Sequence, residues 1–221
     1  MTARIFKLAR KSMVVVVDTK DADAYSSGCV MIKDKVVTLV ASSAFVKGRE
    51  MRLKVVFFDR IELEATVVAV RDSFCLLRTA FHSECKAIRL LKEEEGVVPQ
   101  STFMFAPQSR TTTRRIFTYA TTETLESYLN IESDLAENST NYFMVSCSYF
   151  GKTRFGINRL TAPPVFTMWG RTAGIVLQDC RVAGPGAEMK VTLKARHVRE
   201  LMMLVDPPAA STGPRKKRKR S

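Results

Sequence analysis

The stretch NRLTAPPVF at residues 158–166, with TMWGRTAGIV at residues 167–176 directly after it, decides how the rest of the chain is interpreted. Its first part predicts a loop that ends in a proline pair, and Val165 and Phe166 begin a short apolar strand. Gly170 supplies a turn, and the β-branched residues on each side of it predict a hairpin. We therefore expect two antiparallel strands joined at Gly170, with an irregular loop before them.

This layout resembles the nucleophile region of trypsin-like serine proteases, especially the Do-like (HtrA-type) branch. In that family a G-N-S-G-G-P-V-F-like loop carries the nucleophilic serine, and a G-x-x-x-G-I strand follows it. The frame is present at residues 164–166 and 170–175, but the serine position falls on Thr161. The glycines that flank the family's serine fall here on Arg159, Ala162 and Pro163. The resemblance therefore implies a protease fold whose catalytic loop has been altered.

Two more motifs of the family occur in degenerate form. Residues 38–43, TLVASS, resemble the I-L-T-x-A-H strand that delivers the general-base histidine, and they put Ser43 at the histidine position. Residues 71–78, RDSFCLLR, resemble the D-[IL]-A-[LV]-L segment, and they put Ser73 at the position of the orienting aspartate, with Asp72 one residue early. The degenerate triad positions are thus Ser43, Ser73 and Thr161.

Strand patterns with turn signals between them recur along the chain and predict an all-β fold. The predicted strands cover residues 13–17, 28–32, 36–40, 51–58, 61–70, 87–90, 114–119, 142–149 and 188–194. A further strand contains Leu76 and Leu77, and two apolar strands flank the turn at Gly170. The resemblance spans residues 13–205 and implies a trypsin-like double β-barrel. Apolar residues within 196–205 are spaced as on one face of a helix, and a terminal helix also closes many trypsin-like domains.

The chain is divided into four parts by these patterns. Residues 1–12 are a basic lead-in, for which a short amphipathic helix is one alternative. Residues 13–95 form the first barrel, with the charged break at 92–96 as the linker between barrels. Residues 96–205 form the second barrel and the terminal helix, and they include a polar insertion at 120–141. Residues 206–221 are a Pro/Ala/Ser-rich segment and a basic cluster, which we expect to be disordered.

Composition limits the class of protein. No apolar run approaches the roughly 18–20 residues that span a bilayer, so we expect no membrane association. The five cysteines are odd in number and lack short spacings, which favours reduced, buried thiols in an intracellular protein. Because zinc-ligand spacings are missing and the chain has two histidines, we expect no metal and no cofactor.

Catalysis requires a base that takes the proton of the nucleophile. His82 comes after the strand of the orienting-acid position, where we expect a loop histidine, and His197 begins the terminal helix. Pro163 lacks an N–H, and Arg159 occupies a glycine position that contributes to the oxyanion hole in the family. We therefore predict that the chain is not an enzyme, and an active Do-like serine endopeptidase is the reading that these residues disfavour.

The predicted function is that of a pseudoprotease, a plant-type protease homologue that binds a protein or peptide, for example by strand addition. The formal net charge is +13, and the tail supplies six of these charges. A basic protein associated with nucleic acid is therefore the alternative. We interpret the tail as a nuclear localisation signal read by an import receptor, so the expected location is nuclear and otherwise cytoplasmic. This signal comprises Arg215, Lys216, Lys217, Arg218, Lys219 and Arg220.

Overall fold

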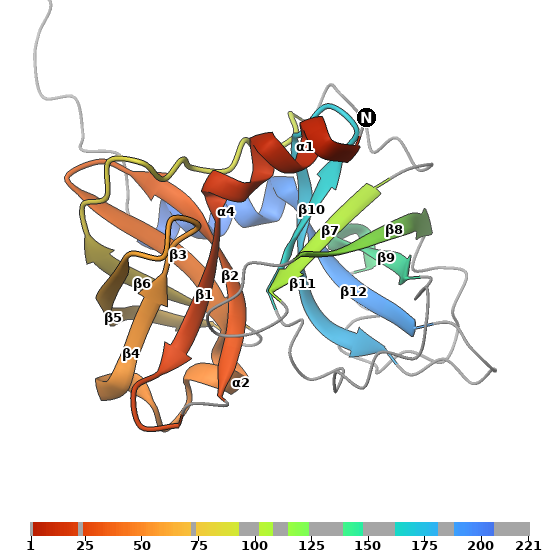
Figure 1. Ribbon diagram of the computed structural model, residues 1–221. Coiled ribbons are helices and arrows are strands. Elements are labelled where there is room, and N and C mark those ends of the chain that lie inside the picture. Colours follow the sequence, from red (N-terminus) through yellow and green to blue (C-terminus); the bar gives the residue numbers. More distant parts are fainter. Residues whose placement is uncertain are drawn as a thin grey trace, which may run out of the picture.

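A computed structural model describes the chain over residues 2–21, 24–71, 74–92, 102–107, 115–123, 139–147, 162–180 and 188–205. In these residues twelve strands close into two antiparallel barrels of six strands each. The barrels lie side by side (Figure 1). The all-β prediction is therefore confirmed.

The first barrel is built from β-branched runs such as Val14–Val17 and from strands whose residues alternate between a buried and an exposed face. Its strands follow the order β1-β2-β3-β6-β5-β4, and pairing of β1 with β4 closes it. Burial of large side chains such as Phe57, Leu39 and Leu77 stabilises it by about 1.5–3 kcal/mol each. The strands are β1 (Met13–Asp18), β2 (Tyr25–Lys33), β3 (Val36–Ser42), β4 (Leu53–Val56), β5 (Glu62–Arg71) and β6 (Phe74–Ala80).

The second barrel repeats the strand order of the first. Read from its first strand, the order is β7-β8-β9-β12-β11-β10, and pairing of β10 with β7 closes it. Gly170 has a φ of 75° in the turn between β10 and β11, as the hairpin prediction required. The strands are β7 (Thr102–Pro107), β8 (Arg115–Glu123), β9 (Tyr142–Cys147), β10 (Pro164–Thr167), β11 (Thr172–Cys180) and β12 (Glu188–Lys194).

Three connecting segments join the two barrels. Helix α1 (Thr2–Ala9) precedes β1 of the first barrel, yet Phe6 and Ala9 pack against Phe103 and Phe166 of the second. Helix α4 (Ala195–Val205) packs through Val198 and Met202 into an apolar cluster that contains residues of both barrels. The segment at 81–92 is the third connection.

The segment at 81–92 bonds through its backbone to both barrels. The N–H of Ile88 donates to the Val30 carbonyl of the first barrel at 2.8 Å. Thr172 of the second barrel exchanges bonds with this segment, donating to Arg89 at 2.7 Å and accepting from Leu91 at 2.9 Å. These bonds leave little freedom between the barrels.

The structure corrects two sequence-based expectations. Residues 87–90 were expected to form a short strand, but only Leu90 makes an isolated bridge, to Thr172, because the segment crosses between the barrels. The polar insertion was expected to begin at residue 120, but β8 continues to Glu123 through pairing with β9. Within the part of the chain that the structure describes, no helix is long and apolar enough to cross a membrane.

Candidate functional site

Ser43, the first of the predicted triad positions, lies at one end of the β3–β6 pair. Strand β3 ends at Ser42, which pairs with Phe74, the first residue of β6. Ser43 follows and begins the short helix α2 (Ser43–Val46), which the Ser42 hydroxyl caps by accepting a bond from the Phe45 N–H at 3.4 Å. Ser73 and Asp72 lie outside the described residues.

The third triad position, Thr161, lies outside the described residues together with Arg159, and the structure takes up again at Ala162. Ala162 is buried and has a φ of 72°. This backbone conformation favours glycine, which is the residue that the family motif has at this position. The Ala162 N–H donates to the Val176 carbonyl at 3.2 Å, and the Val176 N–H donates to Pro163 at 3.1 Å. These bonds hold the end of the loop against β11.

His82 lies at the opposite end of the β3–β6 pair from Ser43. It follows β6, whose last residue, Ala80, pairs with Val36 at the start of β3. The six residue steps from Val36 to Ser42 of β3 correspond to about 20 Å. His82 is buried, with its Nε2 3.0 Å from the Asp59 carboxylate and its ring 4.5 Å from that of Phe57. His82 therefore packs within the first barrel and does not act as a general base near Ser43.

His197 belongs to helix α4 and has a partner within its own helix. Its Nδ1 is 2.8 Å from a carboxylate oxygen of Glu200, three residues later. Hydrogen bonds from Arg196 and His197 hold the pKa of Glu200 below its usual value, with Arg196 as the larger cause. Helix α4 and helix α2, which begins with Ser43, are well separated along the vertical axis of Figure 1.

Three cysteines of the first barrel and its following segment are free thiols: Cys29, Cys75 and Cys85. All three are buried. Burial raises the pKa of each thiol, and that of Cys75 rises to about 12. At neutral pH these thiols are protonated and are poor nucleophiles. The side chains of Cys147 and Cys180 lie outside the described part.

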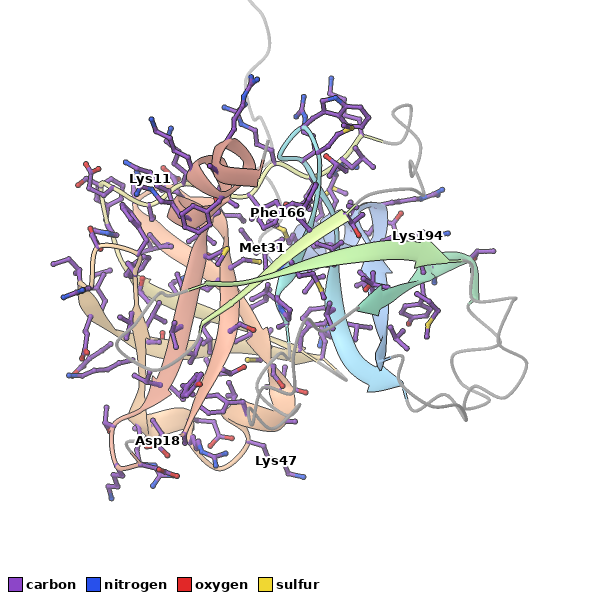
Figure 2. The ribbon with its side chains drawn as sticks, turned by 45° about the vertical axis from the view of Figure 1, so that its right-hand side comes forward. Lys11, Asp18, Met31, Lys47, Phe166 and Lys194 are labelled. Atoms are coloured by element: carbon purple, nitrogen blue, oxygen red, sulfur yellow. The ribbon has the colours of Figure 1, made fainter. Side chains whose placement is uncertain are left out.

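A second surface feature lies at the end of the molecule where α1 crosses between the barrels. A groove of about 320 Å³ is lined by α1, the segment at 86–89 and the turn between β10 and β11. We call it the basic groove, because all of the charged residues that line it are cationic: Arg4, Lys7, Arg10, Lys11, Lys86, Arg89 and Arg171. Figure 2 shows Lys11 and Phe166 in this region, with Lys47 at the opposite end of the molecule.

The sequence did not reveal the basic groove, because its residues come from three segments that are distant in the chain. The signals that were present are the basic lead-in and the lone tryptophan beside Gly170. Trp169 is 60% exposed at the edge of the groove. Only the packing of Phe6 and Ala9 against the second barrel brings the lead-in to this tryptophan.

Comparison with known proteins yields no match to any protein-family model. No curated protein is detectably similar to the chain either.

Proposed function

We propose that this chain is a non-catalytic member of the trypsin-like, Do-like fold family, that is, a pseudoprotease that binds a protein or peptide. Three observations support the family. The two barrels repeat one strand order, a short helix begins at the histidine position Ser43, and Ala162 adopts a glycine-like φ at a glycine position of the nucleophile loop.

The observation that carries the non-catalytic assignment is the location of the histidines. A triad base must lie within hydrogen-bond reach of the nucleophile. The residue at the family's histidine position is Ser43, and its hydroxyl does not act as a base at neutral pH. His82 is engaged with Asp59 at the far end of the first barrel, and His197 is engaged with Glu200. Both histidines thus already have a carboxylate neighbour.

A binding site for a protein or peptide has to lie on the outer surfaces of the two barrels or on the irregular segments between strands. Every strand of both barrels pairs with a neighbour on each side, so strand addition would have to use backbone outside these ladders. The apolar interface between the barrels is filled, with a remaining space of about 10 Å³ among residues such as Met31, Phe74 and Ile175. That space holds at most one water. The double barrel is therefore a rigid body that can present a fixed surface to a partner.

Labelling with a fluorophosphonate tests the non-catalytic assignment. The purified protein should show no labelling and no peptidase activity, because a fluorophosphonate reacts with a hydroxyl that a base has activated. A trypsin sample treated in parallel serves as the positive control. Stoichiometric labelling that disappears in Thr161→Ala would contradict the proposal and favour an active endopeptidase.

We further propose that residues 215–220 direct the protein to the nucleus. The six adjacent like charges repel one another and follow a segment without anchoring apolar residues, so an import receptor can reach them. Deletion of residues 214–221 should move a fluorescent fusion, too large for passive entry, from the nucleus to the cytoplasm with little change in melting temperature. Unchanged localisation together with lost, salt-sensitive nucleic-acid binding would instead make the tail a nucleic-acid arm.

A further inference from the structure

We propose that the basic groove binds single-stranded nucleic acid, with cationic side chains on successive phosphates and a base stacked on Trp169. This site belongs to the folded body and is independent of the basic tail. It also does not depend on the pseudoprotease assignment, since it lies at the end of the molecule opposite helix α2 and Ser43 (Figure 1).

The charged side chains of the basic groove all have the same sign. Its seven charged lining residues are all basic. Lys11 has an acidic partner, Glu84, whose carboxylate is 3.0 Å from Lys11 Nζ. Arg4, Lys7, Lys86 and Arg89 are exposed and make no ion pair with a described residue. Because these four cations lie in a concave surface without described counter-charges of their own, they should attract a polyanion, which releases its counterions on binding.

The backbone beneath these cations is fixed. The Lys86 N–H donates to the Lys11 carbonyl at 2.9 Å, which ties the end of the N-terminal segment to the segment at 86–89. The Thr172 N–H donates to Arg89, which ties the same segment to the β10–β11 turn. The three walls of the groove therefore keep their spacing before a ligand arrives, and binding has little backbone ordering to oppose it.

Two unsatisfied groups point to a ligand with both charge and aromatic faces. Trp169 exposes 60% of its surface, although the turn in which it lies requires only Gly170. Within the described structure, Arg10 Nε is buried and has no hydrogen-bond partner. The Arg10 guanidinium lies 5.7 Å from the Phe58 ring centre, a cation–π contact that orients the side chain.

A single strand satisfies both requirements better than other polyanions. Stacking on an exposed aromatic ring combined with a cationic track is the usual means of binding single strands without sequence preference. A duplex has its base faces stacked internally and offers none to Trp169. An acidic peptide offers charge without a stacking face, and a bilayer surface does not enter a groove. The indole therefore decides between these partners.

The test uses the full-length chain with the six basic tail residues changed to glutamine, so that the tail does not contribute. A fluorescein-labelled 12-nucleotide oligouridylate is titrated by fluorescence anisotropy over a range of salt concentrations. The groove variant combines Arg4→Gln, Lys7→Gln and Arg89→Gln. Its matched control combines Lys20→Gln, Lys47→Gln and Arg71→Gln, three equally exposed cations elsewhere. Both variants lose the same charge and keep buried residues unchanged.

The groove variant should bind at least tenfold more weakly than the parent, and its plot of log K against log salt should be less steep by about 2, for three lost phosphate contacts. The control should stay within about twofold. Trp169→Ala should cost about tenfold and Trp169→Phe much less, since stacking survives on the smaller ring. A matched RNA duplex should bind more weakly than the single strand and should be insensitive to Trp169→Ala.

Three outcomes would overturn the proposal. Equal weakening in the groove variant and its control would mean that only net charge matters. Preference for a polyglutamate peptide or for phosphatidylserine vesicles, with Trp169→Ala without effect on RNA binding, would assign the groove to an acidic protein or a membrane surface. If the tail-neutralised parent shows no salt-sensitive RNA binding, the basic groove is not a nucleic-acid site.

Discussion

Individual residues decide what this fold can and cannot do. Ala162 adopts the left-handed backbone that the family assigns to glycine, which costs about 1 kcal/mol or more for a residue with a Cβ. No pattern in the sequence indicates a positive φ at an alanine, so only the family frame suggested that this position is special. His82 was expected to be a loop histidine without a catalytic role. The structure shows it buried against Phe57 and Asp59, which the sequence could not reveal because both lie in another turn.

The buried thiols of Cys29, Cys75 and Cys85 should be unreactive in the native protein. Burial raises the pKa of Cys75 from 9.0 to about 12, and desolvation is also the main cause of the rise at Cys29 and Cys85. Since the thiolate is the reactive form, these cysteines should resist N-ethylmaleimide at pH 7.5 in the native protein and react in urea. Because their folded pKa is raised, their contribution to stability should be full below about pH 9 and should fall as the pH rises through the folded pKa.

Mass spectrometry of non-reduced, alkylated protein provides the measurement and identifies each site. A disulfide that includes one of these cysteines, or native labelling of Cys75 as fast as that of an exposed thiol, would contradict the account.

Strands and turns were the elements that the sequence indicated best. Local signals define them: β-branched runs for β1, a turn of charged residues between β2 and β3, and Gly170 between β10 and β11. The segment at 87–90 misled the prediction, since an apolar run can bridge two barrels as well as join a sheet. The sequence indicates the N-terminal helix only as one alternative, because the stability of this helix comes from packing on Phe103 and Phe166 of the second barrel.

Close backbone approach explains part of the strand geometry. Gly28 of β2 lies where an added Cβ would be 2.6 Å from the Val40 carbonyl of β3, and an added Cβ at Gly174 would meet the Leu193 carbonyl. Because the obstacle in each case is backbone, it cannot move aside as a side chain would. These two positions let the strands of their barrels curve tightly enough to close.

At the scale of the whole molecule, the two barrels act as one body. Helix α1, the segment at 81–92 and helix α4 each contact both barrels. This arrangement creates the basic groove from three distant segments, and for that reason neither composition nor motif spacing could predict it. The degenerate triad positions remain predictions from the order of local motifs, since Ser73 and Thr161 lie outside the described residues.

Cross-linking of positions 43 and 161 tests whether the chain keeps the protease frame that we propose for it. The variant Ser43→Cys/Thr161→Cys is treated with a short bismaleimide and digested, and linked peptides are identified by mass spectrometry. The control is Ser43→Cys/Trp169→Cys, which pairs Ser43 with the basic groove at the other end of the molecule. The account predicts an intramolecular link between positions 43 and 161 and none in the control. Absence of the 43–161 link, or equal linking in both variants, would contradict it.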